Sequence, residues 1–415
     1  MENFKGFEDE EVQEGTVSMG SSVGAANTAS DTDELRIEEV VTEEKDERSL
    51  QEFKNFCGDR PYLVFDKKDV AHFLDLLSYH SRLGYDHYTM SFKLDTGKLN
   101  TGKVDLVYNN GNVLALSEVA VTSSGNVQSQ IISIDTFLRV YSVSRGYLFI
   151  YEDGGNLYSY AFGGRVYLET LVLVKDICTK EHLVEQLNSK PTKQESVPMT
   201  FISTLKTLYE IIRTGTRIEE KAIYFKGEDT FIYSGIVTGK FPGFGVDLVL
   251  QDLDISTLAR FFFDVTGAIT ISDHEIFLKF SYEGREVFLA KRGLTLSDDM
   301  KHRQVKSNDF VGVNMEQVLT IVGFLINLPN NTGVLDISVG SQGLNLVCFQ
   351  KAMENNSAFK VNGHVSGSGI SDIKLNLDTM KTFLKVFKSQ VELRSQDNKL
   401  HVSGPEGEMT VFGNM

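Results

Sequence analysis

The chain repeats one pattern of apolar and polar positions six times. Each copy begins with a short apolar run that is typical of a strand. It continues through a residue that favours helix N-caps and into apolar positions at helical spacing. The candidate capping residues are 53 to 69 residues apart, and they are Asp66, Asp135, Ser203, Ser256, Asn314 and Asp378. A supersecondary unit that recurs at such a period predicts an architecture of stacked, related units.

Two or three strand-like runs follow each predicted helix. After Asp135 they cover residues 147–151, 156–160 and 166–171, and the turn sequence Glu-Asp-Gly-Gly separates the first two. Short runs divided by such residues are typical of antiparallel hairpins. The predicted unit is therefore β-α-β-β-β with about 60 residues, and the predicted fold class is α+β.

A single unit of this size is too small to bury a core alone, so we expect the units to pack in pairs. The longest polar connections follow the second and fourth units, at 175–197 and 294–307, and the first of them includes a short amphipathic helix. These linkers predict three domains of two units each. The predicted domains cover residues 59–174, 198–293 and 308–415.

Charge is distributed unevenly along the 415 residues, whose formal net charge is −16. Residues 1–50 contain 15 acidic and 4 basic side chains, a net charge of −11, so the rest of the chain carries −5. With few apolar groups to bury, the segment 1–58 is predicted to be an acidic disordered tail. We interpret it as a solubilising tail, and the alternative is an arm that mimics DNA or recruits a partner.

Basic residues occur on five of the six predicted helices, and the fifth helix, 314–328, has none. On a single helix such residues are typical of a solvated face. Their repetition on equivalent helices instead predicts one positive surface that binds a phosphate backbone without base readout. In the sixth helix, Lys381, Lys385 and Lys388 are spaced to share one face. The candidate DNA-binding residues are Lys67, Lys68, Arg82, Arg139, Arg145, Lys206, Arg213, Arg217, Arg260, Lys381, Lys385 and Lys388.

Motifs for catalysis and cofactors are not found. Residues 97–103 approach a phosphate-binding loop, but Val104 replaces the Ser or Thr that contacts magnesium. The histidines lack metal-ligand spacing, and the distant cysteines Cys57, Cys178 and Cys348 indicate a reducing compartment. No apolar run approaches the roughly 18 residues of a membrane span. We therefore expect no enzyme, no cofactor, no bound metal and no membrane partner.

Six such units with basic helices on one side resemble the bacterial β-type DNA sliding clamp. The strongest likeness lies at residues 373–388, where a short strand enters a helix, followed by Val391-Glu-Leu-Arg394. The resemblance implies a DNA-clamp fold with helices around a central channel, and a head-to-tail homodimer closed around duplex DNA. Such a ring is non-catalytic, tethers a DNA polymerase for processive replication, and is opened by an ATP-driven clamp loader. The implied location is the cytoplasm of a bacterial or phage-infected cell.

The resemblance also implies a pocket between the second and third domains, next to the C-terminal strand, for a short apolar peptide of a partner. The candidate pocket residues are Phe241, Phe244, Val411 and Phe412, and ordinary core or turn packing is the alternative. The acidic tail and the C-terminal sequence at 411–415 depart from the family pattern. These departures fit a viral or phage version of the clamp.

Two other functions stay open at this point. A clamp-like factor could tether or regulate an RNA polymerase in transcription, with the acidic tail as an interaction arm. A β-rich structural protein of a virion or another assembly would have no DNA role. Neutralising Lys381, Lys385 and Lys388 should weaken DNA retention by either clamp and leave a structural protein unaffected.

Overall fold

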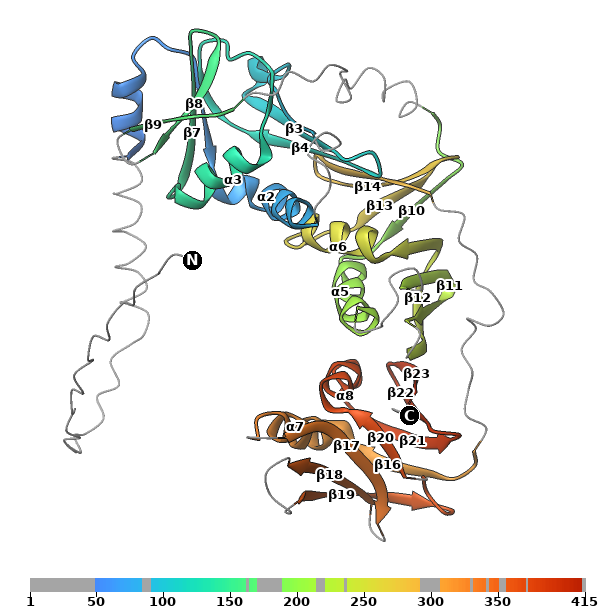
Figure 1. The fold of residues 1–415 in the computed structure, drawn as a ribbon. Helices are drawn as coiled ribbons and strands as arrows, with labels where there is room; N and C mark the ends of the chain where they lie inside the picture. The colour runs from blue at the N-terminus through green and yellow to red at the C-terminus, as the bar shows by residue number, and fades with distance from the viewer. Residues whose placement is uncertain are drawn as a thin grey trace, which may run out of the picture. The chain divides into compact units, whose positions relative to one another are not determined.

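Helices and antiparallel strands alternate along the chain, which confirms the predicted α+β class (Figure 1). The computed structural model describes residues 49–83, 91–161, 164–169, 189–213, 221–234, 237–291, 307–328, 331–340, 343–350, 356–370 and 372–412. The repeat is visible as three successive pairs of units, at residues 62–167, 193–290 and 310–412.

The elements of each pair follow the predicted order closely. The first pair contains β1 (Tyr62–Asp66), α2 (Lys67–Arg82), β2 (Ser91–Asp95), β3 (Lys103–Asn109), β4 (Val113–Ala120), β5 (Thr122–Ser124), β6 (Gln130–Ile132), α3 (Ile134–Val143), β7 (Tyr147–Asp153), β8 (Asn156–Ala161) and β9 (Gly164–Tyr167). The second contains β10 (Lys193–Val197), α5 (Thr200–Ile212), β11 (Ala222–Tyr233), β12 (Val237–Gln251), α6 (Asp252–Phe261), β13 (Ile269–Asp273), β14 (Phe277–Tyr282) and β15 (Arg285–Ala290). The third contains β16 (Phe310–Asn314), α7 (Met315–Ile326), β17 (Asn331–Gly340), β18 (Gly343–Gln350), β19 (Asn356–Ser366), β20 (Ile373–Asn376), α8 (Leu377–Leu384), β21 (Gln390–Gln396), β22 (Lys399–Gly404) and β23 (Gly407–Phe412).

The two units of a pair exchange their first strands. β1 pairs with β7 of the second unit, with Tyr62 opposite Tyr151, and β6 pairs with β2 of the first unit, with Phe92 opposite Ile132. In the third pair, β16 likewise joins β21 and β20 joins β17. Each unit therefore completes its partner's sheet, which gives a physical reason why the units occur in pairs.

Strand pairing also continues from one pair of units to the next. β4 pairs with β15, which joins the first pair to the second, and β12 pairs with β23, which joins the second to the third. The helices follow the same succession. α2 contacts α3, α5 contacts α6 and α7 contacts α8, while α2 also contacts α6 and α5 also contacts α8. The helices thus form one uninterrupted row, in the order α3, α2, α6, α5, α8 and α7.

Two of the six predicted capping residues are confirmed. The Asp66 carboxylate accepts a hydrogen bond from the Lys68 backbone N–H at 2.8 Å, and Asn314 Oδ1 accepts one from Glu316 N–H at 2.9 Å. The other four predictions are wrong, because those helices begin earlier in the chain. The N-cap residues of α3, α5 and α6 are Ser133, Met199 and Gln251, and α8 begins at Leu377.

The start of α6 shows why those predictions failed. The segment from Leu253 to Ile255 alternates like a strand, yet it is helical. The Asp254 carboxylate accepts a hydrogen bond from the Gln251 backbone N–H at 3.0 Å and closes a capping box. Leu253 and Ile255 then belong to the first turn, and Ser256 is buried inside the helix rather than capping it.

Two segment boundaries also differ from the sequence-based ones. Residues 49–57, placed in the disordered tail, are helical, and the fully buried Phe53 packs on Phe149 with ring centroids 4.5 Å apart. β10 begins at Lys193, inside the predicted first linker. The amphipathic stretch predicted in that linker lies outside the described residues, as does most of the second linker. None of the helices that the structure describes is long and apolar enough to cross a membrane.

Candidate nucleic-acid interface and adjoining cavity

The row of helices carries most of the basic residues singled out from the sequence. Lys68 and Arg82 on α2, Arg139 on α3 and Arg145 just beyond it are exposed. None of these four side chains forms an ion pair within the described residues. An ammonium or guanidinium group that is exposed and unpaired is free to contact phosphate oxygens. α2, α3 and the residue just beyond α3 therefore present free cations that the sequence predicts.

The Lys67 side chain makes contacts within the protein instead of projecting from an open surface. Its Nζ donates a hydrogen bond to the Ser144 backbone carbonyl at 2.8 Å and lies 4.3 Å from the centre of the Tyr141 ring. Ser144 is the residue after α3, so the ammonium group meets the negative end of that helix. Lys67 thus fastens the start of α2 to the end of α3.

Arg260 is also engaged in a structural contact. Its Nη1 donates hydrogen bonds to both carboxylate oxygens of Asp75, at 2.9 and 3.1 Å, and its guanidinium lies 4.5 Å from the Tyr79 ring centre. These contacts join α6 to α2 across the boundary between the first two pairs of units. Arg213 pairs with Glu210 at 3.2 Å, and Arg217 lies outside the described residues.

The three lysines near the C-terminus do not share one helix. α8 ends at Leu384, so only Lys381 lies within it, and Lys385 and Lys388 follow in the connection to β21. The predicted single helical face is therefore wrong for this group. Lys385 and Lys388 are nevertheless exposed, and so is Lys206 on α5. α5 and α8 contact each other, which brings these parts of the chain together.

A cavity of about 720 Å³ lies where the second pair of units meets the third. Its walls come from one face of α5, from a bend in β12, from the connection after α8 and from the turn before β23. The lining residues are Ser203, Thr204, Lys206, Thr207, Leu208, Glu210, Phe241, Pro242, Gly243, Phe244, Lys385, Val386, Lys388 and Glu406. This set combines an apolar floor with a rim that carries three ammonium groups.

The predicted pocket residues divide into two groups. Phe241 and Phe244 line the cavity. Val411 is buried within β23, opposite Val237 and Leu400, and Phe412 pairs with Lys399. The structure brings only the first two to this site. Thr207, Glu210 and Glu406 also line the cavity, and no motif in the sequence singles them out.

The bend in β12 depends on a close approach of two backbones. A side chain at Gly243 would place its Cβ 2.4 Å from the Gly227 carbonyl oxygen and 2.6 Å from the Glu228 carbonyl carbon. The register of β11 against β12 shifts between Gly227 and Asp229, so the bend coincides with a bulge. Gly243 therefore allows the strand to turn and form the cavity wall.

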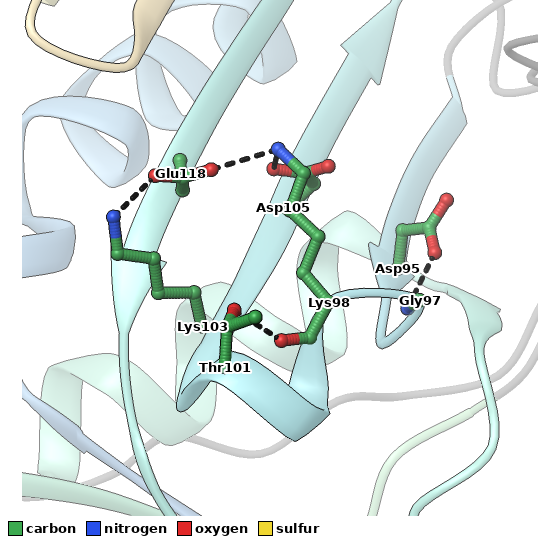
Figure 2. Close-up of polar contacts among 7 residues, drawn as sticks. All are labelled: Asp95, Gly97, Lys98, Thr101, Lys103, Asp105 and Glu118. Carbon is green, nitrogen blue, oxygen red and sulfur yellow. Dashed lines mark hydrogen bonds and ion pairs between the residues drawn. The ribbon is translucent and has the colours of Figure 1, made fainter.

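The Gly97–Lys103 segment, which approaches a phosphate-binding loop in sequence, has its lysines already paired (Figure 2). Lys98 Nζ contacts Asp105 at 3.0 Å and Glu118 at 2.7 Å, and Lys103 Nζ contacts Glu118 at 2.6 Å. Hydrogen bonds from Lys103 and Lys98 lower the pKa of Glu118 to about 2. The segment contains a short 3₁₀ turn, Leu99–Thr101, and a strand rather than a helix begins at Lys103, so it lacks the geometry of a phosphate cradle.

Buried histidines lie beside the boundary between the first two pairs of units. His80 Nδ1 accepts a hydrogen bond from the Asn110 amide at 3.0 Å, and its Nε2 is 3.0 Å from Thr257 Oγ1 on α6. His72 Nε2 is 2.8 Å from Ser117 Oγ. Burial lowers the pKa of His72 to about 3 and that of His80 to about 4. Within the described residues no group of three or more potential ligands could hold a metal ion.

Comparisons with known proteins identify the fold. No family model matches the sequence, and no curated protein matches it. Solved structures do match. A DnaN sliding clamp (DNA polymerase III subunit beta) of Bartonella birtlesii is 13% identical, with a TM-score of 0.64 over 85% of this chain and 99% of that one. The clamp of Pseudomonas aeruginosa is 12% identical with a TM-score of 0.65, over 86% of this chain and 100% of that one.

A third solved structure also matches. The DNA polymerase III beta subunit of Thermotoga maritima is 8% identical to this chain, with a TM-score of 0.66 over 86% of this chain and 99% of that one. At such identities the likeness establishes the fold and not the activity. The expected DNA-clamp fold is therefore confirmed over most of the chain.

Proposed function

Because the chain has the fold of a DNA sliding clamp, we propose that it encircles duplex DNA and tethers a DNA polymerase for processive replication. The observation that carries this proposal is the uninterrupted row of helices with exposed, unpaired cations, in a chain whose net charge is −16. Most of that charge, −11, belongs to residues 1–50, and the rest of the chain is only mildly acidic at −5. Free Lys and Arg side chains are concentrated along one row of helices. This positive surface attracts the phosphate backbone of DNA.

The proposed contacts with DNA are non-specific and non-catalytic. Lys68, Arg82, Arg139 and Arg145 supply cations at one end of the row, and Lys206, Lys381, Lys385 and Lys388 supply them further along. Lys67, Arg213 and Arg260 are left out, because each already has a partner within the protein. None of the described helices has the features of a helix that reads bases in the major groove, so sequence readout is not expected.

Ring closure is proposed to use a second copy of the chain. β9 is the last strand of its five-stranded sheet, so one of its edges is unpaired within the described residues. All four of its residues are exposed, and Val166 and Tyr167 are 38% and 47% exposed. An open strand edge with exposed apolar side chains favours pairing with another strand. The proposal also includes a homodimer closed through this edge and a loader ATPase that opens it. It further includes a location in the cytoplasm.

Removing two of the free cations tests the DNA contact. In Arg139→Ala combined with Arg145→Ala, the slope of log affinity for duplex DNA against log salt should fall by about 2, because each lost phosphate contact removes about 0.9. Lys226→Ala is the control, since Lys226 is exposed on β11 and outside the row. Equal slopes for wild type, the double variant and the control would show that the row of helices does not bind DNA.

A further inference from the structure

A line of tyrosines crosses one face of the five-stranded sheet in the first pair of units. Tyr62 on β1 lies opposite Tyr151 on β7. Tyr158 on β8 lies opposite Tyr151 on one side and opposite Tyr167 on β9 on the other. Residues that lie directly opposite one another on antiparallel strands project from the same face of a sheet. Four neighbouring strands therefore each contribute one tyrosine to the same face.

The other face of this sheet belongs to the protein core. Leu63, Ile150 and Leu157 alternate with the tyrosines along β1, β7 and β8. They are buried in the same core as Val70 of α2 and Phe137 of α3. The line of tyrosines thus lies on the face remote from α2 and α3. It is separate from the row of helices proposed to contact duplex DNA.

Only the β9 end of the line is open. The helix at residues 49–57 contributes Phe56, which packs edge-on against Tyr151 with ring centroids 5.4 Å apart, and Tyr151 is fully buried. Tyr158 is partly buried, and Tyr167 is 47% exposed. The ring centroids of these last two tyrosines are 5.6 Å apart. The open part of the face therefore presents two neighbouring aromatic rings.

A guanidinium group accompanies these two rings. Arg165 on β9 is exposed and lies opposite Tyr160, so its side chain projects from the same face. Its Cζ lies 5.6 Å from the centre of the Tyr158 ring, and it forms no ion pair within the described residues. Arg165 is therefore free to contact an anion that lies beside the rings. We call the surface formed by Tyr158, Arg165 and Tyr167 the tyrosine face.

The chemistry of the tyrosine face favours a single-stranded nucleic acid. Unpaired bases stack on accessible aromatic rings whatever their sequence, and a phosphate links each base to the next. A guanidinium group beside the rings suits that phosphate. A proline-rich peptide also packs on aromatic rings, but it brings no negative charge to Arg165. Duplex DNA keeps its bases within the helical stack, so it has no free base to place on Tyr167.

We propose that the tyrosine face binds single-stranded nucleic acid, with bases stacked on Tyr158 and Tyr167 and a phosphate against Arg165. Binding by stacking does not depend on base sequence. The site does not rely on the proposed encirclement of duplex DNA. It uses side chains on the face of β9, whereas the proposed ring closure uses the backbone edge of that strand, so the two are compatible.

Fluorescence anisotropy on the full-length protein tests the proposal. The probe is a short oligothymidylate labelled with fluorescein. Its control is a labelled chain of the same length with abasic sugars, which carries the same phosphates without bases. We expect the oligothymidylate to bind at least about tenfold more tightly in moderate salt, because only its bases can stack on the tyrosines.

Variants of the tyrosine face separate stacking from charge. Tyr167→Leu keeps an apolar side chain but removes the ring, and should weaken binding of the oligothymidylate by about tenfold, whereas Tyr167→Phe should retain it. Arg165→Ala should lower the slope of log affinity against log salt by about 0.7, the value for one phosphate contact on a single strand. The matched control is Phe263→Ala, since Phe263 is 48% exposed just after α6 and should leave the affinity unchanged.

Tyr158→Leu is a second variant that lies away from the sheet edge, and it should weaken binding to a similar extent. Equal affinities for the oligothymidylate and the abasic chain would overturn the proposal, as would wild-type affinity in both leucine variants. A decaproline peptide that binds more tightly than the oligothymidylate, and loses affinity in Tyr167→Leu, would assign the face to proline-rich segments instead. None of these measurements uses circular DNA, so failure of this site is distinguishable from failure of encirclement.

Discussion

Arg260 on α6 holds Asp75 on α2 through two hydrogen bonds from one guanidinium nitrogen, although the two residues are 185 positions apart in the chain. Both side chains are partly exposed, at 39% and 46%, so the ion pair itself contributes modestly to stability. Its position matters more than its strength. Together with the pairing of β4 and β15, it fixes the first pair of units to the second.

A double-mutant cycle on this pair measures its contribution. Arg260→Ala should lower the free energy of unfolding by about 1 kcal/mol, because it removes the ion pair and the contact with the Tyr79 ring. Asp75→Ala should cost less, since the ring contact survives. Urea unfolding of the two single variants and the double variant should give a coupling energy of about 0.5 kcal/mol. Strict additivity of the two single effects would mean that the residues do not interact in solution.

Acid should weaken the protein through His72 and His80. Their pKa values in the folded state, about 3 and about 4, lie below the ordinary value of 6.5, so the unfolded chain binds protons that the folded chain does not. Stability is therefore fully present above pH 6.5 and falls as the pH drops through this window. Each histidine contributes a slope of about 1.4 kcal/mol per pH unit in the lower part of that range.

Urea unfolding at several pH values between 7 and 5 checks this slope. In His80→Gln, the stability should depend less steeply on pH than in the wild type, because one of the two groups no longer titrates. Burial of the His80 ring and, secondarily, the nearby positive charge of Arg260 lower its pKa and explain the sign, since both disfavour the protonated ring. An unchanged slope in the variant would show that His80 is not held neutral.

The glycine at the β12 bend should not tolerate a side chain. Gly243→Ala forces its Cβ against the β11 backbone and should lower the free energy of unfolding by about 1 to 3 kcal/mol. The matched control is Gly323→Ala in α7, where nothing lies within 4 Å of the added atom. That change should be neutral or stabilise the protein by up to about 1 kcal/mol. Equal effects of the two changes on the melting temperature would contradict the close approach.

The fold follows from signals that are local in the sequence. Apolar runs, turn residues and helical spacing predict the six units and the α+β class, because each signal acts within about ten residues. The exchange of β1 and β6 within the first pair has no such signal. It depends on pairing between strands separated by a whole unit, as with Tyr62 and Tyr151. The predicted helix starts differ from the observed ones where an apolar run belongs to the first helical turn, as at Leu253 and Ile255 in α6.

The candidate site could be predicted only in part. The exposure of cations such as Arg139 and Lys206 could be predicted from their residue type and their position on the helices. The structural roles of Lys67 and Arg260 do not, because their partners are supplied by other elements. The cavity is assembled from α5, the β12 bend and the connection after α8, which are distant in sequence. Phe241 and Phe244 could be singled out by analogy, but the lysine rim depends on the end of α8 at Leu384, which spacing alone did not predict.

Release from DNA on linearisation tests the central claim most directly. Protein is incubated with a nicked circular plasmid long enough for rings to open and close, and the complex is isolated by gel filtration in moderate salt. Half of it is then cut at a single restriction site. A sliding clamp should remain on the circle and leave the linear molecule, and blocking both ends should restore retention. Equal retention on circular and linear DNA, lost alike as salt rises, would contradict encirclement and leave only direct electrostatic binding.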